Sequence, residues 1–311
     1  RDRRRAALWA LKIAGTAAGF GYVAWAVPLG RVARAIGRVD LAALAAACAI
    51  AVVGLAVGAV RWRVLLAAYG APHRPSLARL FHVYCVGFFY NTYLPGGVGG
   101  DVVRGVVTRA SFGERGATAS MAVVLVERAL GLSGLLLLVA GTYVARPLPG
   151  TEGVLPFSAL LLALAFAAIF ALAAGRRLAP SLPGKLGEIA ASLPAIERAL
   201  PFAGALGLSL VTQALVAITG WVILASVSGG RVSLPDALVV VPLAMAAVYF
   251  PFSVGGAGVR ESAFVVLCTR ALLLSEADAL ASSLLLWGVQ LAVAGAGGIA
   301  QLVRPLEARG A

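Results

Sequence analysis

The sequence predicts an all-α, polytopic membrane protein, and its composition and patterning support that class. Of the 311 residues, 61% are hydrophobic and only 13% are charged, whereas soluble domains carry about 25% charged residues. Five long runs contain no Asp, Glu, Lys or Arg: 41–60, 153–175, 199–230, 237–259 and 279–303. Most reach the roughly 20 residues that a helix needs to cross a hydrocarbon core. Their apolar residues do not alternate with polar ones, which favours helices over barrel strands.

Four of these runs and two further apolar stretches predict about six full spans, over residues 7–29, 41–60, 117–145, 155–175, 202–227 and 278–303. The first predicted span, 7–29, follows a basic N-terminus, but it is too long for a signal peptide and lacks a clear small-x-small cleavage site. No polar stretch is long enough for a soluble core of its own. We therefore expect residues 1–311 to form one transmembrane domain.

Two further apolar segments are interrupted by glycine and proline. Residues 77–110 break at Leu94-Pro-Gly-Gly-Val-Gly-Gly100, and residues 236–273 break around Phe250–Gly258. The part after each break runs for only about 10–14 residues before polar sequence follows, which favours a re-entrant hairpin over a full span. We expect two broken hairpins inside the membrane.

The two breaks share a sequence repeat. Pro95-x-x-Val-Gly-Gly-x-x-Val-Arg104 matches Pro251-x-x-Val-Gly-Gly-x-x-Val-Arg260 at an offset of 156 residues. Together with the order of the spans, this predicts two pseudo-repeat halves, about 7–145 and 155–303. With the Arg-rich N-terminus in the cytoplasm, the basic loops lie inside, apart from loop 30–40. One half then begins inside and the other outside, which is the inverted-topology repeat that many secondary transporters use.

Each break also predicts where charged ligands could bind. A helix that restarts after Gly100 or Gly256 presents the positive end of its dipole to the break. Arg104 and Arg260 follow about one turn later, and two guanidinium groups with two dipole ends suit a phosphate clamp. The structural alternative is that Arg104 pairs with Asp101 and Arg260 with Glu261.

A second charged pair, Glu127-Arg128, lies well inside the span 117–145. Charge at membrane depth is costly and often functional. Arg128 could bind a lipid phosphate, and Glu127 could hold an arginine or a substrate amine. A structural pairing of both residues with the hairpins is the alternative.

Motifs for other chemistry are missing from the sequence. It has no Gly-rich phosphate loop followed by Lys and Ser or Thr, so no nucleotide should be bound or hydrolysed. Its two histidines, His73 and His82, have no second His or Cys at metal-ligand spacing, and no catalytic set is evident. We expect neither metal, cofactor nor catalytic residue. The net charge of +13 is explained by basic loops between spans, so we expect no nucleic-acid partner.

At these residues the chain resembles the lysylphosphatidylglycerol synthase transmembrane-region family, the flippase-like domain of the multiple peptide resistance factor. The similarity rests on Arg61-Trp62, Leu94-Pro-Gly-Gly-Val-Gly-Gly-Asp101-x-x-Arg104, Glu127-Arg128-x-x-Gly131 and Pro251-x-Ser253-x-Gly-Gly-x-Gly-x-Arg260-Glu261. The resemblance implies an inner-membrane protein that moves a phospholipid or another amphiphile between leaflets. It carries no synthase activity over, because the soluble aminoacyl-tRNA-dependent domain is missing from this sequence.

The sequence-based hypothesis is thus a flippase or scramblase for an anionic phospholipid or a polyprenyl-phosphate-type amphiphile, with both termini cytoplasmic. A membrane-embedded lipid- or polyprenyl-phosphate-dependent transferase and a non-transporting partner of such an enzyme are the alternatives. Besides the lipid, a second copy in a homodimer and a lipid-modifying enzyme are the partners considered. The predicted substrate-binding residues are Pro95, Gly99, Gly100, Asp101, Arg104, Glu127, Arg128, Pro251, Ser253, Gly255, Gly256, Arg260 and Glu261.

Overall fold

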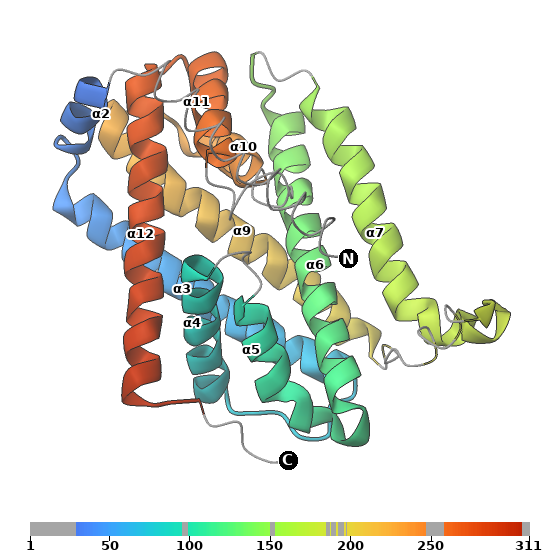
Figure 1. Cartoon of the computed structure of the whole chain (residues 1–311). Coiled ribbons are helices and arrows are strands. Elements are labelled where there is room, and N and C mark those ends of the chain that lie inside the picture. Colours follow the sequence, from blue (N-terminus) through green and yellow to red (C-terminus); the bar gives the residue numbers. More distant parts are fainter. Residues whose placement is uncertain are drawn as a thin grey trace, which may run out of the picture. The chain divides into compact units, whose positions relative to one another are not determined.

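The computed structural model describes residues 29–94, 99–149, 153–184, 187, 191, 196, 198–246 and 258–306. Every regular element in these residues is helical, as Figure 1 shows. The α-helices are α2 (Leu29–Ile36), α3 (Leu41–Ala68), α4 (Leu77–Tyr93), α5 (Gly99–Thr108), α6 (Gly116–Ala145), α7 (Val154–Leu178), α9 (Ala199–Ser228), α10 (Leu234–Ala246), α11 (Val259–Leu272) and α12 (Glu276–Val303). Two short 3-10 helices, Arg109–Arg115 and Ala179–Ser181, follow α5 and α7.

Four of the described helices are long and apolar enough to cross a membrane: α3, α6, α9 and α12. This confirms the prediction of an all-α polytopic membrane protein. Helices α6, α9 and α12 begin and end within a few residues of the predicted spans 117–145, 202–227 and 278–303. Helix α3 continues past the predicted end at residue 60 to Ala68, which places Arg61 and Arg63 within the helix. The predicted span 7–29 lies almost wholly outside the described residues.

The two interrupted segments are built from short helices. Helices α4 and α5 have 17 and 10 residues, and α10 and α11 have 13 and 14. Each is shorter than the roughly 20 residues of a full span. The residues between them, 95–98 and 247–257, lie outside the described part of the chain. The end of α4 before Leu94 and the start of α5 at Gly99 agree with the predicted break.

Within its described residues, the chain forms two compact units that interleave along the sequence. Unit 1 takes residues from Arg1–Val52, Leu138–Leu155 and Ala214–Val293, and unit 2 from Val53–Leu137, Pro156–Gln213 and Ala294–Ala311. Helices α4 and α5 belong to unit 2, and α10 and α11 belong to unit 1. The predicted inverted repeat stays a prediction.

In unit 1, helices α10 and α12 each begin with a serine cap. Ser233 precedes α10 and Ser275 precedes α12, and the hydroxyl of each accepts the backbone N–H of an aspartate three residues on, at 3.4 Å for Asp236 and 3.1 Å for Asp278. Such caps satisfy backbone donors that the first turn leaves unpaired. The aspartates also pair with arginines: Arg146 lies 3.0 Å from Asp236 and Arg38 lies 3.5 Å from Asp278.

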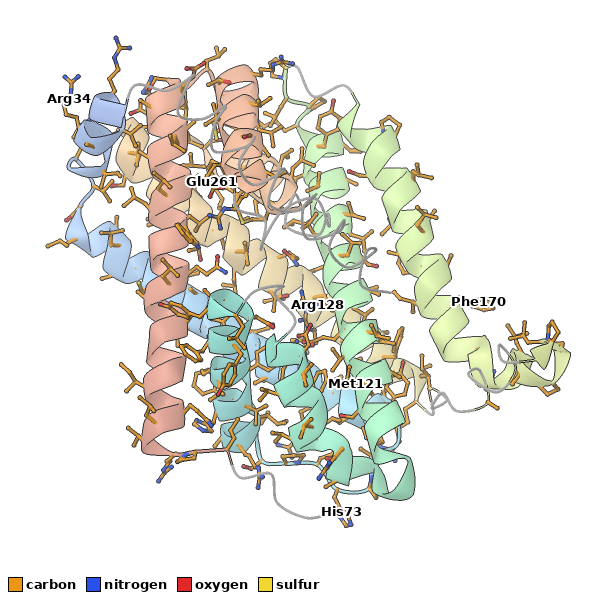
Figure 2. All side chains as sticks on the ribbon, viewed as in Figure 1. Arg34, His73, Met121, Arg128, Phe170 and Glu261 are labelled. Atoms are coloured by element: carbon orange, nitrogen blue, oxygen red, sulfur yellow. The ribbon has the colours of Figure 1, made fainter. Side chains whose placement is uncertain are left out.

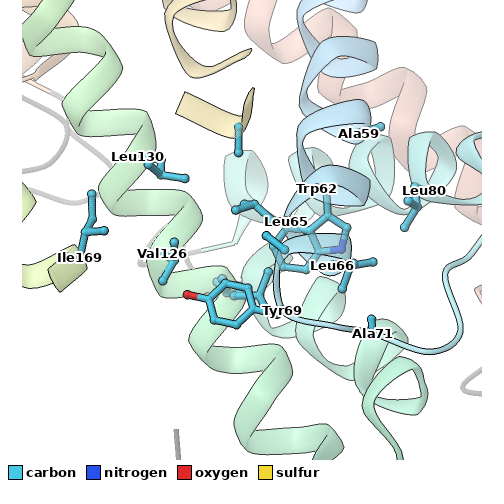
Figure 3. Close-up of a cluster of buried hydrophobic side chains, with 14 residues drawn as sticks. Ala59, Trp62, Leu65, Leu66, Tyr69, Ala71, Leu80, Val126, Leu130 and Ile169 are labelled. Carbon is cyan, nitrogen blue, oxygen red and sulfur yellow. The ribbon is translucent and has the colours of Figure 1, made fainter. Parts of the chain in front are cut away.

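Unit 2 has an apolar core around the end of α3. Trp62, Leu65 and Leu66 of α3 are fully buried, and Figure 3 shows them beside Val126 and Leu130 of α6. Gly58, one turn before Trp62, makes room for a ring of α4, because a Cβ there would lie 2.5 Å from Tyr84. Small residues at such positions let membrane helices approach closely. The core thus holds α3, α4 and α6 in contact where the charged residues of unit 2 lie.

Candidate functional site

Arg104 is positioned by the contact between α4 and α5. The two helices cross at Gly87 and Gly100, where any side chain at Gly100 would overlap the backbone of Gly87. Asn91 of α4 accepts a hydrogen bond from the backbone N–H of Gly100 at 2.8 Å and donates one to Asp101 at 3.3 Å. The amide of Asn91 therefore caps the first turn of α5, which satisfies a donor that has no partner within the helix.

Glu127 of α6 is the acceptor for three donors from three helices. Its carboxylate lies 2.8 Å from Arg61 of α3 and 2.5 Å from Arg104 of α5, and it also accepts the hydroxyl of Tyr84 of α4. Glu127 is only 2% exposed. A buried carboxylate needs such charged partners, because desolvation without them would cost several kcal/mol.

Asp101 is the second acceptor, and it joins a buried arginine to a more exposed one. It accepts a hydrogen bond from Arg104 of α5. It also pairs with Arg128 of α6, whose Nε and Nη2 lie 2.8 Å and 2.6 Å from Oδ2 of Asp101. Arg128 exposes 41% of its side chain, whereas Asp101, Arg104, Glu127 and Arg61 expose 11% or less. Arg128, labelled in Figure 2, is thus the accessible member of the group.

Aromatic and hydroxyl groups complete the surroundings of these ions. The guanidinium of Arg104 lies 5.2 Å from the ring centroid of Trp62 and 4.7 Å from that of Tyr84, distances at which cation–π attraction operates. Arg61 also donates to Ser209 and Thr212 of α9, at 3.0 Å and 3.2 Å. The hydroxyls hold Arg61 in place without adding negative charge.

The resulting ion cluster, Arg61, Asp101, Arg104, Glu127 and Arg128, carries three positive and two negative charges. Its members come from α3, α5 and α6 and fold together in unit 2. The excess of one guanidinium over the carboxylates suits an anionic ligand, and arginine binds phosphate in a two-pronged geometry that matches its planar fork. Among the described residues of unit 2, the cluster is therefore a candidate site for a phosphate group.

The second repeat motif places Arg260 in a simpler setting in unit 1. Arg260 and Glu261 are 5% and 1% exposed, and the Nε of Arg260 lies 3.0 Å from the carboxylate of Glu261. Glu261, labelled in Figure 2, also accepts the backbone N–H of Gly258 at 2.7 Å, which caps α11. The guanidinium of Arg260 lies 5.7 Å from the ring centroid of Trp287. Among the described residues, Arg260 and Glu261 thus form a neutral pair.

Sequence reasoning found part of this arrangement. The structure brings the predicted residues Gly100, Asp101, Arg104, Glu127 and Arg128 together, with Gly99 at the start of α5. It pairs Arg260 with Glu261, and both arginines contact the neighbouring carboxylates that the structural alternative named. The other predicted residues, Pro95, Pro251, Ser253, Gly255 and Gly256, lie outside the described residues.

Other members of the site were missed or given little weight. Arg61 entered only through the family resemblance, and Tyr84 and Asn91 were not among the predicted site residues. A useful clue was available for Arg61: the apolar run resumes after Arg63, so the helix could have been extended through both arginines.

The helical spans and buried ion pairs define a polytopic membrane protein with a charged site among its apolar helices. Residues 9–298 match the family model described as the lysylphosphatidylglycerol synthase transmembrane region. The chain therefore belongs to this family, which confirms the resemblance and points to a membrane role connected with lipids. Comparison with curated proteins gave no match.

Proposed function

We propose that the protein moves a lipid with a phosphate headgroup between the two leaflets of the inner membrane, with both chain termini in the cytoplasm. The observation that carries the proposal is the ion cluster of unit 2, where three arginines face two carboxylates and Arg128 is accessible. Charged side chains within membrane helices are rare and usually mark the path of a substrate or ion. Family membership supports the link to lipids.

In this proposal the headgroup phosphate first meets Arg128. The phosphate takes the place of Asp101 on part of the guanidinium fork, while Arg104 and Asn91 keep Asp101 oriented. Glu127 balances Arg61 and Arg104, so the interior of the cluster keeps its charge pairing when a ligand binds.

The experiment is transport in proteoliposomes with fluorescent anionic and zwitterionic phospholipids, comparing Arg128→Gln and Arg128→Lys with the unaltered chain. Loss of a charge-assisted hydrogen bond is worth about 1.5–3 kcal/mol, so Arg128→Gln should slow anionic-lipid transport by about tenfold to a hundredfold. Arg128→Lys should recover only part of the rate, because lysine keeps the charge but lacks the fork.

Arg79→Gln is the matched control, since Arg79 is an exposed arginine of α4 in the same unit that is not part of the ion cluster, and its rate should equal that of the unaltered chain. Unchanged transport by folded Arg128→Gln protein would contradict the role of the cluster. A new lipid product in vesicles supplied with soluble donors, without lipid transfer between leaflets, would instead establish the transferase alternative.

A further inference from the structure

A groove in unit 2 lies along the end of α3, the residues that lead to α4, and the start of α9. Its volume is about 510 Å³. Six of its lining residues are apolar and two are arginines: Val60, Arg63, Val64, Ala67, Arg74, Leu77, Leu200 and Pro201. None of the lining residues belongs to the ion cluster.

The groove has one wall from a single face of α3. Val60, Arg63, Val64 and Ala67 follow the spacing of three, four and seven residues that puts side chains in one row on a helix. Arg61 is two residues from Arg63, which turns it about 200° away on the helix, and it pairs with Glu127 in the ion cluster. The end of α3 therefore presents one arginine to the cluster and another to the groove.

The opposite wall is tied to α3 by the backbone. The N–H of Arg198, immediately before α9, donates to the carbonyl of Ala68 at the end of α3 at 3.2 Å. This bond holds the first turn of α9, with Leu200 and Pro201, beside the last turns of α3. Leu77 and Leu200 expose 42% and 84% of their surface, so apolar surface is available along the groove.

The two arginines of the groove have no partner among the described residues. Neither Arg63 nor Arg74 makes an ion pair or a side-chain hydrogen bond with the described part of the chain, and the groove lining contains no carboxylate. In contrast, the arginines of the ion cluster are paired with Asp101 or Glu127. Two cations beside an apolar groove complement a ligand with a hydrocarbon chain and an anionic head.

We infer that this groove binds an anionic diacyl phospholipid as a resident lipid, separate from the proposed transport site. One acyl chain lies against Val60, Val64 and Ala67 of α3, and the phosphate lies between Arg63 and Arg74. Arginine stems pack on apolar surface while their charged heads reach the headgroup region, which matches an arginine at the edge of an apolar groove. The lipid joins α3 to the start of α9.

Native mass spectrometry of the full chain in detergent, titrated with phosphatidylglycerol and with phosphatidylcholine of the same acyl chains, tests this inference. A basic residue near an anionic lipid is worth about 1 kcal/mol. Arg63→Gln and Arg74→Gln should therefore each weaken binding of phosphatidylglycerol about fivefold, and the double variant about 25-fold. Ala67→Trp should also remove binding while both arginines remain, because the indole fills the groove.

Two controls separate the groove from other sites. Arg34→Gln removes an exposed arginine of α2 in unit 1 and should leave phosphatidylglycerol binding unchanged. Arg128→Gln removes the accessible arginine of the ion cluster and should remove at most the lipid of the proposed transport site, so that phosphatidylglycerol remains bound in the groove. The second control also separates the inference from the proposed function, since transport can fail while the lipid stays bound.

Three results would overturn the inference. The first is equal affinity of the double variant and the unaltered chain for phosphatidylglycerol, or equal affinity of the unaltered chain for phosphatidylcholine. The second is competition by soluble glycerophosphate at a concentration similar to that of the lipid, which would show a site for phosphate alone. The third is a dimer whose formation depends on Arg63 and Arg74, which would show that a second copy occupies the groove.

Discussion

The two repeat motifs place the same arginine in different electrostatic surroundings. Arg104 in unit 2 contacts Asp101 and Glu127, which bind further arginines from α3 and α6. Arg260 in unit 1 contacts Glu261, the next residue in the chain. The repeat offset aligns Asp101 with Ala257 and Glu261 with Gly105. Arginine is therefore the only charged residue that the two motifs share at equivalent positions. A motif can thus repeat its arginine without repeating the charge balance around it.

The largest effect that separates the two regions should come from the helix crossing of unit 2. Gly100→Ala would place a methyl group against the backbone of Gly87, and backbone cannot move aside as a side chain can. Ordinary overpacking costs about 1–3 kcal/mol and occasionally more. Because the clash here is with backbone, we expect the helix crossing itself to be lost, together with the contacts of the ion cluster that depend on it. The folded yield and the unfolding temperature in detergent should both fall, and Asn91 should lose its bond to Gly100.

Gly207→Ala is the control for this substitution. Gly207 lies in α9 of the same unit, and a Cβ there would meet nothing within 4 Å. Its unfolding temperature should stay equal to or slightly above that of the unaltered chain, since alanine favours helix more than glycine. Equal stability of the two variants would mean that α4 and α5 do not cross at Gly87.

A smaller effect on the unfolding temperature should come from substitutions in the buried ion pairs, first of one carboxylate alone and then of both partners. Asp101→Asn and Glu261→Gln each remove a carboxylate from a buried arginine, and breaking a buried ion pair costs about 3–5 kcal/mol. Removing both partners should restore stability in unit 1, so Arg260→Gln with Glu261→Gln should unfold close to the temperature of the unaltered chain. The matching pair in unit 2, Asp101→Asn with Arg104→Gln, should not recover, because Arg128 loses the acceptor that it shares with Arg104.

Unfolding curves of the four variants, measured in one detergent, check the difference between the two units. Recovery of both double variants would show that Asp101 and Arg104 form an isolated pair. Failure of both would show that Arg260 has further partners that matter to the fold.

The smallest effect on stability, and the sharpest test of the repeat, should come from single cysteines after the two short helices. In a background without Cys48, Cys85 and Cys268, Ala110→Cys follows α5 and Leu273→Cys follows α11. Both positions are exposed, so neither change should lower the unfolding temperature by more than about 2 °C. The inverted repeat predicts that impermeant thiol reagents label the two cysteines from opposite sides of the membrane; labelling from the same side would contradict it.

Much of the helix layout could be predicted from the sequence, because helix length in a membrane is set by the thickness of the hydrocarbon core. The predicted span 117–145 and helix α6 (Gly116–Ala145) differ by one residue at the start. The break before Gly99 was also predictable, since proline and clustered glycine end a helix locally.

The partners of the buried charges were harder to predict. Which side chains meet depends on how α3, α4 and α6 pack, and in membrane helices the lipid-facing and protein-facing sides are both apolar. The pattern of hydrophobic residues along α3 therefore does not reveal that Arg61 faces Glu127 while Arg63 faces the groove. Tyr84 was missed for the same reason: its hydroxyl matters only because Gly58 lets the ring approach Glu127.

The order of the cluster along the chain has a consequence for biosynthesis. Ribosomes deliver the N-terminal helices first, and the three residues that donate to Glu127 (Arg61, Tyr84 and Arg104) all precede it in the sequence. When α6 leaves the ribosome, the groups that neutralise its carboxylate have already been synthesised, so its acid need not enter lipid alone. Arg260 and Glu261 are made one after the other and enter as a neutral unit. Chain order thus limits how long each charge is without its partner during insertion.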